Sequence, residues 1–98
     1  MNCSISQKAQ GDLISIWDYT FKNWSLNQAD SYYQFIIDKI SEVCNKPDIG
    51  KSFEKFRTGY WGATVKSHII FYKLSSKNKI EIIRILHQRM DLKTRLNE

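Results

Sequence analysis

Four side chains in the second half of the chain could together cleave a phosphodiester without a metal: Lys66, Arg84, His87 and Arg89. Such a reaction needs a base for the attacking hydroxyl, an acid for the leaving oxygen, and cations for the crowded phosphate. The same residues also suit binding without chemistry, because one histidine beside arginines is commoner at binding and structural surfaces. We expect a binding surface here and keep the nuclease as the alternative.

Nothing in the sequence predicts a metal site or a cofactor. No two His or Cys residues and no clustered carboxylates have the spacing of metal ligands. Cys3 and Cys44 are the only cysteines, and we expect both to stay reduced and to pack as small apolar side chains. His68 begins an apolar run, so we expect a structural histidine that donates to a neighbouring backbone carbonyl.

Charge is divided unevenly along the 98 residues. Residues 1–50 hold four Lys and six Asp or Glu, net −2, whereas residues 51–98 hold eleven Lys or Arg and four acids, net +7. The basic half either faces a polyanion or an acidic partner, or is a solvated surface that favours solubility. No apolar run approaches the roughly 18 residues that span a bilayer, and no signal-peptide core opens the chain. We therefore expect a cytoplasmic protein without membrane contact.

The first elements that position these residues are a strand and a helix. Apolar and polar residues alternate over residues 1–6, which predicts a short strand, and Ser6 suits a helix N-cap. Over residues 7–24 apolar positions recur three and four apart, as on one face of an amphipathic helix. The predicted buried face comprises Ala9, Leu13, Ile16, Trp17, Thr20, Phe21 and Trp24.

A second helix should begin after Ser25, which forms a capping box with Gln28, and should end before Pro47. Its predicted buried stripe comprises Ala29, Tyr33, Ile36, Ile37, Ile40, Val43 and Cys44. Only a residue or two separates the two helices, which predicts an antiparallel αα-hairpin.

The second half of the chain predicts a turn, a loop and three strands. Residues 47–51 should form the turn, and residues 52–58 a loop with a possible short helix. Residues 59–74 are rich in β-branched and aromatic side chains, which predicts two strands with a turn at Gly62-Ala63. Residues 75–78 should close a hairpin into a strand over Ile80–His87. Five of those eight residues are Ile or Leu, so we expect that strand mid-sheet and covered on both faces.

The element order β-α-α-β-β-β, followed by a short tail, predicts one α+β domain over residues 1–98. The αα-hairpin should bury its stripe on one face of a small antiparallel sheet. Arg84 lies inside the most apolar strand, where it either ends at an edge or must pair, with Glu81 or Asp91 as the expected partner.

Five groups of residues, in this order along nearly the whole chain, resemble the ParE toxins of bacterial type II toxin–antitoxin modules, within the wider RelE/ParE superfamily. They are Asp12-Leu13-x-x-Ile16-Trp17-Asp18-Tyr19-Thr20, Trp24 with Gln28-Ala29, Pro47-x-x-Gly50-Lys51, His68-x-x-Phe71-Tyr72, and Ile82-x-Arg84-Ile85-Leu86-His87-x-Arg89-Met90-Asp91. The last group is the most specific. One departure is Gly59-Tyr60-Trp61, where the family usually has an Arg in place of Trp61.

The resemblance implies an αα-hairpin on an antiparallel sheet and a toxin that inhibits DNA gyrase without being an enzyme. It also implies neutralisation by a cognate antitoxin in a hetero-oligomer. RelE relatives cleave messenger RNA on the ribosome, but the tyrosine that those nucleases often carry near the C-terminus is absent from this tail. A ribosome-dependent endonuclease is therefore the first alternative, and a basic nucleic-acid-binding module the second.

We predict two binding surfaces. The target should meet the basic residues in and near the tail: His87, Arg89, Lys93, Arg95, Arg84 and Lys66. A flexible, acidic antitoxin segment should lie along the αα-hairpin and cover a second set: Trp24, Tyr32, Tyr19, Arg57 and Trp61.

Overall fold

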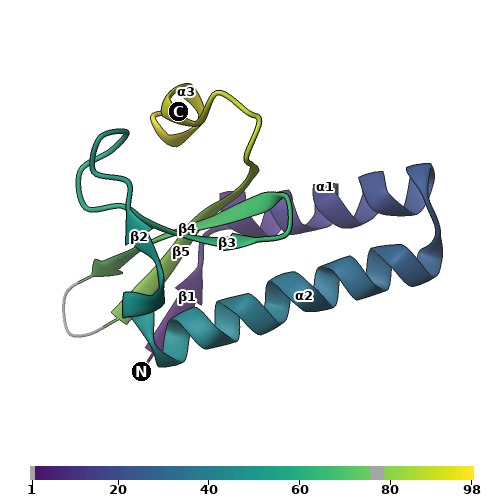
Figure 1. Cartoon of the computed structure of the whole chain (residues 1–98), viewed down its shortest axis with the longest axis horizontal. Helices are drawn as coiled ribbons and strands as arrows, with labels where there is room; N and C mark the ends of the chain where they lie inside the picture. The colour runs from purple at the N-terminus through teal and green to yellow at the C-terminus, as the bar shows by residue number, and fades with distance from the viewer. Residues whose placement is uncertain (1, 76–78) are drawn as a thin grey trace.

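The computed structural model describes residues 2–75 and 79–98 (Figure 1). Its main elements follow the predicted order, but a short strand, β2, and a short helix in the tail, α3, were not predicted. The elements are β1 (Asn2–Ile5), α1 (Gln7–Asn23), α2 (Leu26–Asn45), the 3-10 turn η1 (Pro47–Ile49), β2 (Lys51–Ser52), β3 (Trp61–Val65), β4 (His68–Ser75), β5 (Lys79–His87) and α3 (Leu92–Leu96). The predicted hairpin turn at 76–78 lies outside the described residues. Its strands nevertheless pair from Ser75 with Lys79.

The two helices begin where the sequence predicts, because serine hydroxyls cap both. Ser6 Oγ accepts the Ala9 N–H at 3.0 Å, and Ser25 Oγ accepts the Gln28 N–H at 3.1 Å. Each bond satisfies a donor that a helix start leaves without an intrahelical partner. The αα-hairpin is confirmed, and its closed end projects beyond the sheet (Figure 1).

The sheet has the strand order β1-β5-β4-β3-β2. The strands β3 to β5 form the predicted antiparallel meander. The short strand β2 lies where a turn and a loop were predicted, and it pairs antiparallel with β3, whereas β1 pairs with β5 in parallel. The sheet is therefore mixed rather than antiparallel. The connection from β1 to β5 runs through α1, α2 and the strands β2 to β4. It is long enough for parallel neighbours, which require a crossover that returns the chain to the starting end.

The turn predicted at Gly62-Ala63 is wrong, because both residues lie inside β3 and the turn falls at Lys66 and Ser67. Gly62 has a packing role instead. A Cβ there would collide with the ring of Phe53, which lies over the strand. The predicted loop after Ser52 is confirmed, but it forms turns rather than a short helix.

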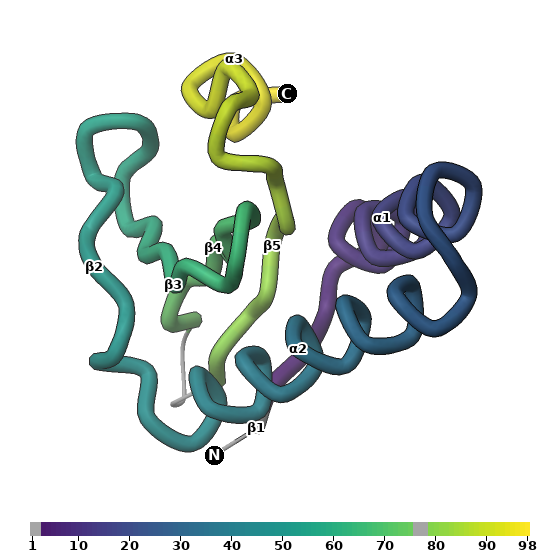
Figure 2. Tube along the Cα trace, turned by 45° about the vertical axis from the view of Figure 1, so that its right-hand side comes forward, coloured from purple at the N-terminus to yellow at the C-terminus, as the bar shows by residue number. Residues whose placement is uncertain are grey.

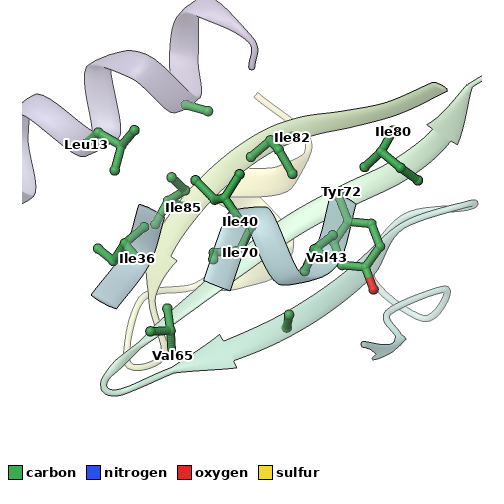
Figure 3. Close-up of a cluster of buried hydrophobic side chains, with 12 residues drawn as sticks. Leu13, Ile36, Ile40, Val43, Val65, Ile70, Tyr72, Ile80, Ile82 and Ile85 are labelled. Carbon is green, nitrogen blue, oxygen red and sulfur yellow. The ribbon is translucent and has the colours of Figure 1, made fainter. Parts of the chain in front are cut away.

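Apolar side chains cover both faces of the sheet. On one face Leu13, Ile36, Ile40 and Val43 of the helices pack on strand residues that include Ile82 (Figure 3). On the other face the segment 53–60 and α3 supply a second cluster: Phe53, Tyr60, Ile69, Phe71, Leu86 and Leu96. Figure 2 shows the hairpin and α3 on either side of β5, so the prediction of a strand covered on both faces is confirmed.

The predicted buried stripes hold near the sheet and fail toward the closed end of the hairpin. Phe21, Trp24 and Tyr33 are 46%, 69% and 39% exposed. The hairpin runs past the sheet, so Phe21 and Trp24 have no strand beneath them. Tyr33 is exposed for another reason, because the buried face of α2 is shifted by one residue. Tyr32, one residue away from the predicted stripe, packs against the core in place of Tyr33.

Cys3 and Cys44 form a disulfide, which corrects the prediction of two reduced cysteines. Cys3 lies on β1 and Cys44 in the last turn of α2, with their Cα atoms 5.9 Å apart. The bond joins an edge strand to the end of the hairpin across 41 positions of sequence.

Candidate functional site

One corner of the sheet gathers basic and imidazole side chains, and we call Lys66, His68, His87 and Arg89 the basic corner. The β3–β4 turn and the end of β5 meet there, since the Gln88 N–H donates to the Ser67 carbonyl at 2.9 Å. His68 and His87 are directly opposite each other in the β4–β5 register, with ring centroids 5.1 Å apart and planes at 77°. Only His87, Arg89 and Lys66 of this group were predicted as target contacts.

Helix α2 supports the basic corner through Tyr32. Its hydroxyl lies 2.7 Å from His68 Nδ1 and accepts the Ser67 N–H at 3.2 Å. Because the hydroxyl oxygen already accepts from Ser67, we assign the hydroxyl as the donor to His68 Nδ1. Neutral His68 then carries its own ring proton on Nε2. The partner predicted for His68, a backbone carbonyl, is wrong, because its Nδ1 contacts the Tyr32 hydroxyl instead.

The environment of His68 keeps its ring neutral. Burial, and secondarily the neighbouring His87, lower the pKa of His68 to about 4, while the more distant Asp12 carboxylate opposes this shift. Burial disfavours the charged imidazolium, because the protein solvates it less well than water does. Neutral His68 therefore adds no charge to the basic corner beside the cations Lys66 and Arg89.

Lys66 occupies a strained position in the β3–β4 turn. Its φ is 54°, the one positive value at a non-glycine residue in the described part of the chain. A β-carbon disfavours that region, so another contact must hold the turn. Lys66 Nζ lies over the ring of Phe35, 4.4 Å from its centroid, in a cation–π contact that fixes the lysine at the corner.

Arg84 is predicted as a target contact, yet its guanidinium is used inside the protein. Its Nε and Nη2 donate to the two Asp12 carboxylate oxygens at 2.9 and 3.1 Å, and both side chains are largely buried. Hydrogen bonding to Asp12 raises the pKa of Arg84 further above its ordinary range. The prediction of a structural ion pair is confirmed, but the predicted partners Glu81 and Asp91 are wrong.

Asp12 is the partner because helix α1 begins where β1 ends. The last register pair of β1 is Ile5 with Ile82, so the following part of β5 has no strand on that side. Asp12 fills the gap and also accepts the Ile85 N–H at 2.9 Å. Arg84 is thereby drawn inward and cannot belong to a catalytic set with His87.

The other predicted target residues lie on the tail, away from the basic corner. Lys93 and Arg95 are exposed on α3, whose Leu96 is buried against the second face of the sheet. Arg57 anchors this helix by donating from Nη1 to the Leu96 carbonyl at 2.7 Å. The basic surface therefore has two parts, the corner and the tail.

The predicted antitoxin contacts are also spread out. Trp24 and Tyr19 are 69% and 65% exposed on the helical hairpin, whereas Tyr32 is half-buried at the basic corner. Trp61, 40% exposed, lies at the opposite end of β3 from the Lys66 turn. These residues do not form one compact surface, so a partner that touched them all would have to be extended.

Sequence reasoning missed Phe35 and the contact between Tyr32 and His68. The one signal in the sequence was the position of the buried face of α2. If that face is shifted by one residue, Tyr32 points to the sheet instead of Tyr33. Within residues 2–75 and 79–98 no group of three or more His, Cys, Asp or Glu could hold a metal ion. None of the helices described is both long and apolar enough to cross a bilayer.

Comparisons with known proteins show which proteins the chain is similar to. The family model described as "ParE toxin of type II toxin-antitoxin system, parDE" matches residues 4–92. A protein named Toxin ParE1 from Mycobacterium tuberculosis is 35% identical over 88 residues, which cover 90% of each chain. A Toxin ParE1 from Caulobacter vibrioides is 34% identical over 92 residues, 94% of each chain.

A solved structure described as the chromosomal ParDE TA system from P. aeruginosa has the same fold. Its chain superposes with a TM-score of 0.79 at 19% identity, over 89% of this chain and 95% of that one. The two chains therefore share a fold over most of their length.

Proposed function

The chain belongs to the ParE toxins of type II toxin–antitoxin systems, and from that premise we propose that it inhibits DNA gyrase until a cognate antitoxin neutralises it. The observation that carries the proposal is the family match from residue 4 to residue 92, which includes β5 and the basic corner. A complex of gyrase with cleaved DNA is strongly anionic, and the +7 half of the chain suits it.

Binding rather than catalysis is the proposed mode of action. The nuclease alternative needs Arg84 beside His87, but the ion pair with Asp12 uses that arginine. The pKa of His68 near 4 also makes it a weak general base near neutral pH. Both observations support a toxin that blocks its target by occupying it.

The test is a supercoiling and cleavage assay with purified gyrase. We expect the protein to block supercoiling or to accumulate gyrase-cleaved DNA, while ribosome-bound messenger RNA stays intact. Combined replacement of Lys66, His87 and Arg89 by glutamine should weaken the effect, and replacement of the exposed Lys46 and Lys55 should not. Cleavage of messenger in the ribosomal A site, with gyrase unaffected, would overturn the proposal.

The proposed antitoxin is a flexible acidic segment that folds on binding. The exposed aromatic side chains of the hairpin offer it an apolar contact, and the basic half offers complementary charge. The assembly would be a hetero-oligomer of both chains. Mixing the toxin with the product of the adjacent reading frame should give a nanomolar complex and restore gyrase activity, and absence of binding would contradict this part.

A further inference from the structure

The two histidines of the basic corner each use one ring nitrogen inside the protein. His68 Nδ1 contacts the Tyr32 hydroxyl at 2.7 Å, and His87 Nδ1 accepts the Arg89 N–H at 3.1 Å. Neither Nε2 has a hydrogen-bond partner among the described residues, and within that part no buried side-chain nitrogen or oxygen lacks a partner. The Nε2 atoms of His68 and His87 are therefore both open to solvent.

Both open nitrogens are donors. The Arg89 N–H occupies the Nδ1 lone pair of His87, so neutral His87 carries its proton on Nε2. The Tyr32 hydroxyl fixes the same tautomer in His68, because the Ser67 N–H fills its acceptor position. A metal ion would need a lone pair on Nε2, so these tautomers disfavour a metal and favour a ligand that accepts hydrogen bonds.

The charges that surround these donors are mainly positive. Lys66 comes from the β3–β4 turn and Arg89 from the end of β5, and no described carboxylate forms an ion pair with either. Helix α1 contributes Asp12, whose carboxylate is held by Arg84, and helix α2 contributes the neutral Tyr32. A ligand at this corner therefore meets two N–H donors and two cations.

We propose that His68, His87, Lys66 and Arg89 form a binding site for an oxyanion with the chemistry of a phosphate group, and that Tyr32 positions His68 within it. Phosphate offers several strong acceptor oxygens to such donors, and a charged oxygen shortens and strengthens each bond. In the target complex the ligand would be a backbone phosphate of DNA. That last assignment rests on the proposed function, whereas binding of phosphate itself does not.

The site should take up a proton when it fills. A bound anion favours the imidazolium form, so it raises the pKa of His68 from its low value in the free protein. Affinity should therefore increase as the pH falls toward the lowered pKa of His68. The other charged groups that face the two rings are Lys66, Arg89 and Asp12, and Asp12 is paired with Arg84.

The experiment follows the imidazole resonances of the whole protein by NMR near about pH 6. Inorganic phosphate is added at constant ionic strength, with sodium chloride as the reference, and a short DNA duplex forms the second arm. We expect saturable shifts of both imidazoles with phosphate, a raised pKa of His68 at saturation, and the same two rings perturbed by the duplex. Gyrase is absent, so failure here is distinguishable from failure of the proposed function.

Matched variants locate the site. His68→Asn and His87→Asn should each weaken phosphate binding about tenfold, and Lys66→Gln about threefold. Lys55→Gln, at an exposed lysine outside the corner, should leave the affinity unchanged. Tyr32→Phe should weaken binding less than His68→Asn and should change the tautomer signal of His68.

Several results would overturn the inference. One is that phosphate moves the imidazole resonances of the wild-type protein no further than chloride does, a result that does not depend on any variant folding. Another is an equal loss in Lys55→Gln and Lys66→Gln, which would indicate diffuse charge rather than a site. Binding of phosphate without any effect of the duplex would overturn the assignment to DNA.

Discussion

Replacing Asp12 by Ala should lower the free energy of unfolding by about 3 kcal/mol, because it removes one partner of a largely buried ion pair. Asp12 and Arg84 side chains are 16% and 12% exposed, and the carboxylate accepts three bonds, two from Arg84 and one from the Ile85 N–H. Removing one partner of a fully buried pair costs roughly 3–5 kcal/mol. Glu98, 3.6 Å from Arg84, can compensate in part, which places the cost at the lower end.

Thermal unfolding followed by circular dichroism measures this cost, and a midpoint lower by roughly 10–20 °C is expected for a domain of this size. The control is Asp18→Ala, which breaks an exposed i,i+4 pair with Lys22 and should cost less than about 0.5 kcal/mol. In a double-mutant cycle, Asp12→Ala with Arg84→Met should be less damaging than the sum of the single changes by at least about 1 kcal/mol. Additive effects, or equal losses in Asp12→Ala and Asp18→Ala, would refute the reasoning.

Three further predictions concern the disulfide, the strained turn and the buried histidine. Replacing Cys3 and Cys44 by Ser should lower the free energy of unfolding by about 4 kcal/mol, because the disulfide closes a loop across 41 positions and so limits the entropy of the unfolded chain. Denaturation of the wild-type protein with and without a reductant measures this loss, and identical midpoints would contradict the prediction. The variant Lys66→Gly should be more stable than Lys66→Ala by about 1 kcal/mol. Both variants lose the Phe35 contact, but only glycine accepts a φ of 54° without strain. Equal melting temperatures would show that the turn is unstrained. The pKa of His68 is about 4 in the folded protein and 6.5 in the unfolded chain, so the unfolded chain binds the proton first as the pH falls. The free energy of unfolding is therefore highest above pH 6.5 and decreases as the pH drops toward 4. The half-buried ring is partly screened by solvent, so this loss of stability should be about 1–2 kcal/mol. Urea denaturation in a phosphate-free buffer should show the loss in the wild-type protein and not in His68→Gln. The same pH dependence in both proteins would exclude His68 as its source.

Local signals in the sequence predicted the elements well. The caps at Ser6 and Ser25 act within three residues, and Pro47 ends the helix within one turn. A few neighbouring residues are therefore enough to predict where these helices begin and end. The β-branched density of Ile80–His87 likewise indicated a strand covered on both faces. The fold class follows from the order of such elements.

The mistakes discussed next involve contacts that the local sequence does not show. Arg84 was expected to pair within seven residues, but its partner Asp12 is 72 residues away. Cys3 and Cys44 lie together only because β1 pairs with β5 in parallel and α2 ends beside it. Gly62 resembles a turn residue in sequence, and only the position of the Phe53 ring shows why a strand needs a glycine there.

The candidate site was predicted in part for the same reason. Charge and residue type indicated His87, Arg89 and Lys66, and the structure brings these three to one corner. The pairing of His68 with Tyr32 depends on the angle at which α2 crosses the sheet, which no periodicity fixes. The inward direction of the Arg84 side chain depends on Asp12 of α1, a helix that begins only one residue beyond the end of β1.

The parallel pairing of β1 with β5 also orders events during synthesis. Asn2–Ile5 is the first strand to be made, and its partner Lys79–Ile82 is the last strand to appear. Contacts between such distant segments form late, because the entropy of closing the loop precedes any gain from pairing. Until then the αα-hairpin exists without the sheet that buries its apolar face. Any activity that depends on the folded corner can begin only after almost the whole chain has left the ribosome, and that interval leaves the exposed hairpin available to a binding partner.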